Sequence, residues 1–233
     1  MLKVCKFGGS SVAGAEQFRK VRDIVLSDDS RRVVVISAAG KRTSDDHKLT
    51  DLLYLCHAHL TYGVSCADIL AAIRSRFVSI RDELGLSYRV EDEFDAYAAT
   101  LSRDTSVDEL VSRGEYFTAR LMAETLGYAF VDAADCVFFG FDGQFDRART
   151  DAAIATALEK NGKIVLPGFY GRVPTGKIKV MTRGGSDITG ALAAAAVNAD
   201  VYENWTDVSG ILMADPRIVE NPRPIPRITY AEL

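Results

Sequence analysis

Residues 182–217, TRGGSDITGALAAAAVNADVYENWTDVSGILMADPR, carry the clearest succession of loop, helix and strand signals in the chain. The glycine pair at 184–185 permits a tight turn and lets the backbone approach a ligand closely. Ser186 or Asp187 is then expected to cap a helix, and the alanine-rich run at 191–196 suits close packing on a sheet. The stretch therefore predicts a loop, a helix packed on a sheet, and a following strand.

The start of this helix also predicts a binding site for an anion. The first N–H groups of a helix are unpaired, and the helix dipole favours negative charge there. Arg183 adds a planar cation that can grip a carboxylate or a phosphate in two places. A glycine turn, a helix cap and a surface arginine explain the same residues, and this stretch alone does not separate the two interpretations.

The rest of the chain alternates apolar strands with amphipathic helices. Strands are expected at 2–7, 32–36, 128–131, 137–139 and 163–167, from residue 201, and in a hairpin that returns through 178–180. Helices are expected at 13–26, 48–62, 69–80, 91–101, 107–126 and 147–160, after Asp187 and after Thr229. Because strands and helices alternate, the sequence predicts an α/β fold with a mostly parallel sheet that helices cover on both faces.

Two of the expected strands end in residues that suit a ligand site. Lys6 and the glycines at 8–9 end the first strand, where a lysine and free amides can bind phosphate oxygens. Ser37 and Thr43 follow the second strand, and their hydroxyls can hold a carboxylate. Ligands gather at the carboxyl ends of strands in open parallel sheets, although plain turns explain the same residues. The first turn matches neither G-x-x-x-x-G-K-[ST] nor G-x-G-x-x-G, which argues against a Walker P-loop and a dinucleotide fold.

The helix expected at 107–126 contains Gly114 and Glu115 near its middle. A glycine there costs about 1 kcal/mol relative to alanine, so it indicates close approach by a ligand or by another backbone segment. Glu115 is then a candidate for holding the ammonium group of a ligand. Taken alone, the glutamate is more simply explained as a surface residue that pairs with a charge one helical turn away.

Composition and charge exclude several classes of function. The 233 residues are 48% hydrophobic and 26% charged, with a net charge of −4, as in ordinary globular domains. The sequence has no Lys/Arg block for nucleic acid or an anionic membrane, no apolar run near the roughly 20 residues of a membrane span, and no secretory signal at 1–7. Four scattered cysteines read as reduced thiols, which predicts a cytoplasmic protein without a zinc or disulfide framework. The three histidines lack ligand spacing and are expected to be structural or solvated, and no metal site built from protein ligands is expected.

Six motifs occur in an order that is specific, although each motif is weak alone. They are Lys6-Phe7-Gly8-Gly9-Ser10-Ser11-Val12, Ser37-Ala38-Ala39-Gly40, Arg113-Gly114-Glu115, Gly168-Phe169, Arg183-Gly184-Gly185-Ser186-Asp187, and Trp205-Thr206-Asp207-Val208-x-Gly210 with Asp215-Pro216-Arg217. In this order they resemble the aspartate kinases (aspartokinases) of the amino acid kinase family. The resemblance covers essentially the whole chain.

The resemblance implies transfer of the γ-phosphoryl group of ATP, with Mg²⁺, to the β-carboxylate of L-aspartate. The product would be 4-phospho-L-aspartate, which leads to lysine, threonine and methionine. The resemblance also implies a three-layer α/β/α sandwich. Residues of about 1–170 would form the amino-acid-binding lobe and about 171–233 the nucleotide-binding lobe.

Residue roles are implied only at positions that match the family motifs. The catalytic residues would be Lys6, which meets the transferred phosphate, and Asp187, which orients Lys6. The residues implied for aspartate binding are Ser37, Thr43, Glu115, Arg183, Gly184, Gly185 and Ser186. The residues implied for ATP binding are Lys6, Phe7, Gly8, Gly9, Ser10, Thr206, Asp207, Leu212 and Arg217. Arg183 suits the α-carboxylate of aspartate and Glu115 its ammonium, which leaves the β-carboxylate free to attack.

The chain departs from the family pattern in three places. Leu212 stands where aspartate kinases commonly have a tyrosine, and residues 177–182 differ from the usual threonine-rich loop. The kinase domain of the family continues past Leu233, and regulatory ACT domains usually follow. The sequence therefore predicts a truncated kinase domain with an incomplete nucleotide lobe. Lysine and threonine should not inhibit such a chain. A homodimer is compatible with it.

Three alternatives remain beside an aspartate kinase. One is a kinase for another small amino acid such as glutamate. Another is a fragment that binds ligand or a partner without turnover. A nicotinamide oxidoreductase is the least favoured, because no G-x-G-x-x-G follows the first strand.

Overall fold

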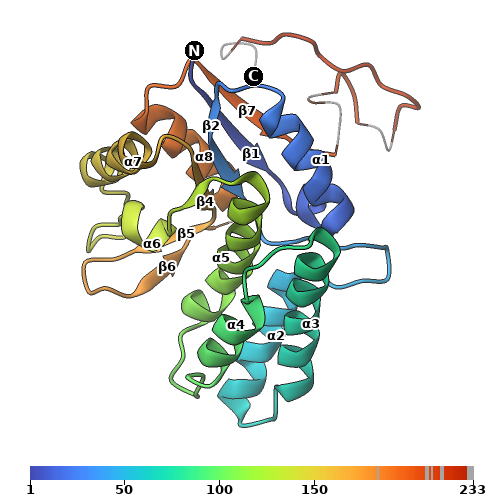
Figure 1. Ribbon diagram of the computed structural model, residues 1–233, viewed down its shortest axis with the longest axis vertical. Coiled ribbons are helices and arrows are strands. Elements are labelled where there is room, and N and C mark those ends of the chain that lie inside the picture. The colour runs from blue at the N-terminus through green and yellow to red at the C-terminus, as the bar shows by residue number, and fades with distance from the viewer. Residues whose placement is uncertain (183, 208–209, 211, 216–217, 230–233) are drawn as a thin grey trace.

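The computed structural model describes residues 1–182, 184–207, 210, 212–215 and 218–229 (Figure 1). The strands are β1 (Lys3–Phe7), β2 (Arg31–Ile36), β3 (Ala129–Phe130), β4 (Ile164–Pro167), β5 (Tyr170–Arg172), β6 (Ile178–Val180) and β7 (Val201–Trp205). The helices are the 3₁₀ turn η1 (Gly9–Val12) and α1 (Ala15–Leu26), α2 (Leu49–Tyr62), α3 (Ala67–Leu84), α4 (Val90–Ala98), α5 (Val107–Leu126), α6 (Ala133–Cys136), α7 (Arg147–Asn161) and α8 (Gly185–Ala196). Across the described residues, none of these helices has the length and apolar character that crossing a bilayer requires.

One five-stranded sheet forms the middle layer of the molecule. Its strands are all parallel and lie in the order β3-β4-β2-β1-β7. Helices α1 and α5 cover one face, and α7 and α8 cover the other (Figure 1). The prediction of a three-layer α/β/α sandwich around a mostly parallel sheet is confirmed. The hairpin predicted around residues 174–177 is also present, as the antiparallel pair β5-β6.

The central strand β2 shows how one sheet builds two cores. Val34 and Ile36 lie in the core that contains α1 and α5, whereas Val33 and Val35 lie in the core that contains α7 and α8. Successive side chains of a strand point to opposite faces. A strand buried on both faces therefore needs an uninterrupted apolar run, which the sequence supplies here.

Helices α2, α3 and α4 extend the layer that contains α5, away from the sheet (Figure 1). Phe77 of α3, Phe94 of α4 and Phe117 of α5 pack together with ring centroids between 5.3 and 6.0 Å apart. Such offset or edge-to-face contacts are favourable for aromatic rings. Residues 65–126, all of them described, contain helices and no strand, as predicted.

The strand predicted at 137–139 is wrong. The chain there follows the short helix α6 and makes only isolated bridges, to residues 145 and 172. The amide of Phe138 donates to the hydroxyl oxygen of Thr150 at 3.0 Å and not to a neighbouring strand. Apolar residues in a short run do not by themselves distinguish a strand from a buried loop.

The helix cap predicted at Ser186 or Asp187 is also wrong. The cap of α8 is Gly184, which makes no side-chain capping bond and has a φ of 78°. This left-handed conformation favours glycine. Ser186 and Asp187 lie instead in the first turn of α8, where both line the cleft described below. The helix predicted after Thr229 lies outside the described residues.

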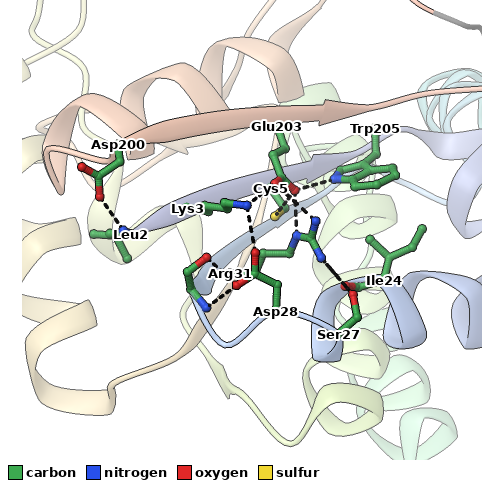
Figure 2. Close-up of polar contacts among 11 residues, drawn as sticks. Leu2, Lys3, Cys5, Ile24, Ser27, Asp28, Arg31, Asp200, Glu203 and Trp205 are labelled. Carbon is green, nitrogen blue, oxygen red and sulfur yellow. Dashed lines mark hydrogen bonds and ion pairs between the residues drawn. The ribbon is translucent and has the colours of Figure 1, made fainter.

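A network of charged side chains connects β7, the strand at one edge of the sheet, with β1 and β2 (Figure 2). Glu203 of β7 accepts hydrogen bonds from Nε of Arg31 at 2.8 Å and from Nε1 of Trp205 at 2.9 Å. The ammonium of Lys3 lies 3.3 Å from the other carboxylate oxygen of Glu203. The network supplements the backbone pairing of β7 with β1.

Candidate active site

Four strands of the sheet end at one cleft, which has a volume of about 1260 Å³. Strand β1 leads into the glycine turn at 8–9, β2 into residues 37–44, β4 into Phe169 and β7 into Asp207. The first turns of α2 and α8 complete its walls. The cleft thus lies at the carboxyl ends of the parallel strands, where open α/β sheets bind ligands.

The loops after β1 and β2 touch backbone to backbone at Gly9 and Gly40. The amide of Gly40 donates to the carbonyl oxygen of Gly9 at 2.8 Å. A Cβ on Gly40 would lie 2.7 Å from the carbonyl carbon of Gly9, and a Cβ on Gly9 would lie 2.8 Å from the carbonyl oxygen of Ala38. Glycine at both positions allows this approach and places the two loops side by side in the cleft.

Lys6 is a largely buried cation of the cleft. Its Nζ lies 2.7 Å from Oδ1 of Asp187, and its side chain is 10% exposed. Nδ2 of Asn204 donates to the same oxygen of Asp187 at 3.1 Å. A Cβ on Gly8 would be 3.6 Å from Nζ of Lys6, so the ammonium lies beside the glycine turn. A cation beside a glycine turn in this arrangement can bind an anionic group.

Glu115 lies on α5 and is 5% exposed, yet it lines the cleft. The explanation of Glu115 as a paired surface residue is therefore wrong. Gly114 brings α5 close to the loop after β2, since a Cβ at this glycine would lie 3.0 Å from Cβ of Ala38. Oε2 of Glu115 has no hydrogen-bond partner among the described residues. Burial raises the pKa of Glu115 to about 8, although hydrogen bonding from the Ala38 backbone acts in the opposite direction.

A buried carboxyl group with one oxygen unpaired among the described residues has a clear chemical preference. An ammonium group beside it would favour its ionised form and satisfy the free oxygen. The cleft therefore offers a site for a cationic group at Glu115 and a site for an anionic group at Lys6.

The structure brings most of the predicted site residues together. Those that line the cleft are Lys6, Gly8, Gly9, Ser10, Ser37, Thr43, Glu115, Gly184, Gly185, Ser186, Asp187 and Asp207. Thr206 is next to the cleft, and its hydroxyl donates to Oδ1 of Asp207 at 3.2 Å. Arg183 and Arg217 lie outside the described residues.

Phe7 and Leu212 are not among the residues that line the described cleft. The ring of Phe7 is 1% exposed and stacks on Trp205 with their centroids 6.0 Å apart. A nucleotide could therefore meet Phe7 only through its backbone. Leu212 forms an isolated bridge with Pro224. Contacts of both residues with ATP stay predictions.

A mostly polar rim of the cleft, with three cations at Lys41, Arg42 and Lys48, was not predicted from the sequence. The rim comes from the loop after β2, from the start of α2 and from the segment before α8, and consists of Lys41, Arg42, Ser44, Lys48, Thr50, Asp51, Tyr54, Met181 and Thr182. A signal for part of this rim is present in the sequence, because its cations directly follow a strand that already leads into Ser37 and Thr43. Cations at that place favour a negatively charged ligand.

The described residues include no group of three or more His, Cys, Asp or Glu side chains that could hold a metal ion. Magnesium that arrives with a nucleotide is bound mainly by phosphates, with one or two carboxylates and water. Asp207 is exposed and lines the cleft, so its carboxylate fits such a role. The residues present are compatible with magnesium held on a bound nucleotide.

The fold and the cleft define an α/β protein in which a glycine turn and a buried lysine lie together at the carboxyl ends of parallel strands. A sequence profile of the amino acid kinase family matches residues 1–233. The chain belongs to the amino acid kinase family.

Several proteins similar to this chain are aspartokinases. The chain is 34% identical to aspartokinase 3 of Bacillus subtilis over 246 residues, which cover 100% of this chain and 54% of that protein. It is 33% identical to the lysine-sensitive aspartokinase 3 of Escherichia coli over 255 residues, which cover 98% of this chain and 54% of that protein. The chain spans about half the length of the curated relatives it matches.

Solved structures give the same result. Aspartate kinase of Clostridium acetobutylicum superposes with a TM-score of 0.94 at 45% identity, over 99% of this chain and 53% of that chain. Aspartokinase III of E. coli, solved in complex with aspartate and ADP, superposes with a TM-score of 0.80 at 30% identity, over 97% of this chain and 53% of that chain.

Proposed function

We propose that the chain carries the catalytic site of an aspartate kinase, which transfers the γ-phosphoryl group of ATP to the β-carboxylate of L-aspartate. The products would be ADP and 4-phospho-L-aspartate, in the first step toward lysine, threonine and methionine. The observation that carries the proposal is that Lys6 lines the same cleft as Glu115, whose Oε2 has no hydrogen-bond partner among the described residues. Similarity to aspartokinases along the whole chain, and the E. coli complex with aspartate and ADP, support it.

Aspartate offers one ammonium and two carboxylates to this cleft. Glu115 suits the ammonium, and the approach of that charge would lower the raised pKa of Glu115. Binding near neutral pH would then release a proton from the protein. The hydroxyls of Ser37, Thr43 and Ser186 suit the carboxylates. Arg183, implied for the α-carboxylate by family resemblance, is part of the proposal although it lies outside the described residues.

The transfer step needs positioning more than acid–base chemistry. An oxygen of the β-carboxylate forms a bond to the γ-phosphorus while the bond to the β–γ bridging oxygen breaks, and ADP leaves with that electron pair. The β-carboxylate is ionised near pH 7, so no general base is required. Consistent with this, no histidine is among the described residues that line the cleft. Lys6 and the amides at 8–9 would stabilise the charge of the transferred group.

ATP would lie with its phosphates at the glycine turn. Ser10, Thr206 and Asp207 lie at or next to this part of the cleft. Mg²⁺ bound to the phosphates would neutralise part of their charge, and Asp207 would contribute a carboxylate directly or through water. The division implied by the family resemblance, with about 1–170 mainly for aspartate and about 171–233 mainly for the nucleotide, stays part of the proposal, although the glycine turn of the first lobe would meet the phosphates.

The proposal also extends to the cellular location of the chain and to its oligomeric state. The four cysteines are free and buried, which suits a reducing compartment and supports a cytoplasmic location. A homodimer is compatible with the chain and stays a prediction.

An ATP-dependent hydroxamate assay on the purified chain tests the proposed reaction. Hydroxylamine traps an acyl phosphate, so L-aspartate, L-glutamate and no amino acid are compared at equal ATP and magnesium. Signal with L-aspartate alone is the expected result. Signal with glutamate would assign a different substrate, and absence of any signal from folded chain would favour a fragment that binds ligand without turnover. Circular dichroism on the same sample establishes that the chain is folded.

A further inference from the structure

Arg76 of α3 reaches away from its helix into the loops that line the cleft. Its side chain is 5% exposed. Nη1 donates to the carbonyl oxygen of His47 at 2.6 Å, and Nη2 donates to the carbonyl oxygens of Gly40 at 2.5 Å and Ala13 at 3.4 Å. Nη2 also lies 3.6 Å from Oδ2 of Asp46. One guanidinium group therefore joins three backbone carbonyls and approaches one carboxylate.

The three carbonyls belong to the two loops that form one side of the cleft. Ala13 directly follows η1, which continues from the glycine turn after β1. Gly40 and His47 lie near the two ends of the segment 40–48 after β2, which we call the rim loop. Lys41, Arg42, Thr43 and Ser44 of the rim loop line the cleft. The planar fork of arginine, with donors fixed in one plane, can hold several carbonyl oxygens at once.

Contacts within the rim loop shape the loop but do not attach it to the rest of the protein. Asp46 accepts three hydrogen bonds from Arg42, from its amide at 3.0 Å, Nε at 2.8 Å and Nη2 at 3.1 Å. Attachment at the start of the loop comes from the bond between the Gly40 amide and the carbonyl oxygen of Gly9 at 2.8 Å. Arg76 supplies bonds to both ends of the loop, so it is placed to set the position of the loop as a unit.

Burial of an arginine at this position requires an explanation beyond packing. Ile73, Phe77 and Ile80 of the same helix are buried in the apolar core, and Arg76 lies at helical spacing on that face. Burying a guanidinium is expensive, and an apolar side chain of similar size often serves a core equally well or better. The direction of the bonds, all toward the cleft loops, indicates what the arginine does.

We propose that Arg76 is a positioning residue that fixes the rim loop against the turn after β1, so that Thr43 and the neighbouring glycine turn face the ligands in one geometry. The consequence for catalysis rests on the proposed aspartate kinase function, whereas the consequence for the loop does not. A displacement of only about 1 Å in such a site can lower the rate by up to a hundredfold.

The test compares Arg76→Met and Arg76→Lys with Arg31→Met as a matched control. Arg31 is also largely buried, with a side chain 12% exposed, and its bonds to Ile24 and Glu203 do not involve the loops of the cleft. The first measurement is hydrogen exchange of the backbone amides of Gly40 and Asp46. The second is the KM for L-aspartate and kcat in the hydroxamate assay, together with the melting temperature of each variant.

Arg76→Met is expected to speed exchange of these amides about tenfold or more and to raise the KM for aspartate about tenfold, with a smaller change in kcat. Arg76→Lys, which keeps the charge but loses the fork, should give intermediate values. Arg31→Met should lower the melting temperature without either effect. The lysine variant also keeps the test decisive if the methionine variant does not fold.

The inference is overturned if both Arg76 variants leave amide exchange in the rim loop and the KM for aspartate unchanged, or if Arg31→Met changes both equally. A chain without turnover on aspartate would contradict the proposed function instead. In that case the exchange of Gly40 and Asp46 alone would decide the role of Arg76.

Discussion

Nζ of Lys6, at the end of β1, lies 2.7 Å from Oδ1 of Asp187, in the first turn of α8. The two side chains differ in environment, because Lys6 is 10% exposed and Asp187 is 48% exposed. Nδ2 of Asn204 in β7 donates a hydrogen bond to the same carboxylate oxygen at 3.1 Å. An arriving phosphoryl group can therefore bind the Lys6 ammonium, which is already extended into the cleft and largely shielded from water.

Replacing Lys6 by alanine is expected to lower turnover about 10²–10³-fold, the usual effect of losing one electrostatic donor at a reacting group. The variant should still fold, because the sheet around Lys6 is built from apolar strands. Asp187→Asn keeps the shape of the partner but removes its charge, and it should lower turnover less than Lys6→Ala. Steady-state hydroxamate kinetics measure both effects, with thermal melting as the control. Near-normal turnover in Lys6→Ala would remove Lys6 from the mechanism.

Glu115 predicts a dependence of stability on pH. Burial raises the pKa of Glu115 from its ordinary 4.5 to about 8, so the folded protein holds a proton that the unfolded chain releases at lower pH. The resulting contribution to stability is complete below pH 4.5 and is lost as the pH rises through about 8. We therefore expect the free energy of unfolding of the wild type to fall between pH 5 and pH 9 relative to that of Glu115→Gln, which carries no titratable group there.

Ligand binding separates this effect from general instability at alkaline pH. At pH 9, L-aspartate should raise the melting temperature of the wild type, because its ammonium pairs with the ionised Glu115. The same concentration should have little effect on Glu115→Gln. Equal stabilisation of both proteins by aspartate would show that Glu115 does not bind the ammonium. Succinate, which lacks the amino group, serves as the matched ligand control.

The central sheet could be predicted from the sequence because its strands carry simple signals. The run of β-branched residues in β2 and the turns after β1 and β4 suffice for a parallel sheet with ligands at its carboxyl edge. The segment at 137–139 could not be predicted in this way, since its apolar residues are buried without entering a ladder. The amide of Phe138 there bonds to the hydroxyl of Thr150, a tertiary contact that the hydrophobic pattern does not report.

Much of the candidate site could be predicted, because its residues follow strand ends or begin a helix. Glu115 lies in the middle of a helix, and its burial depends on how α5 meets the loop after β2, which is a tertiary relationship. The role of Arg76 is even harder to predict from the sequence, because its partners are backbone carbonyls 29, 36 and 63 residues away. Backbone acceptors carry no sequence signature. The one hint was a charged residue on an otherwise apolar helix face.

The contact between Gly9 and Gly40 predicts a specific sensitivity to a single methyl group. In Gly40→Ala the new Cβ would meet backbone atoms of Gly9 and Ser10 at 2.7–2.9 Å, so the two loops would have to separate. We expect a loss of about 1–3 kcal/mol in unfolding free energy and weaker binding of aspartate and ATP, measured by denaturation and calorimetry. Gly14→Ala is the control, since the nearest atom to its Cβ is a side-chain oxygen at 3.5 Å. Equal effects of the two substitutions would contradict a steric role for the contact.

The network around Glu203 predicts where the protein loses stability in acid. Although burial opposes ionisation, hydrogen bonds from Arg31, Trp205, Cys5 and Lys3 lower the pKa of Glu203 to about 2, from an ordinary 4.5. A depressed pKa contributes stability that is complete above the ordinary value and is lost as the pH falls through the folded value. This contribution should therefore disappear between about pH 4.5 and pH 2.

Glu203→Gln tests whether the charge of Glu203 stabilises the protein. The amide keeps the shape of the side chain but removes the negative charge that pairs with Arg31 and Lys3. At pH 7 the variant should lose about 3 kcal/mol of unfolding free energy, as expected when one member of a largely buried ion pair is neutralised. The difference from the wild type should shrink as the pH approaches 2, since the wild-type carboxylate is then protonated as well. Urea denaturation at several pH values measures it. Glu16→Gln is the control, because it removes an exposed pair with Lys20, and it should change stability very little. A difference for Glu203→Gln that stayed constant from pH 7 to pH 2 would mean that packing, rather than charge, holds β7 to the sheet.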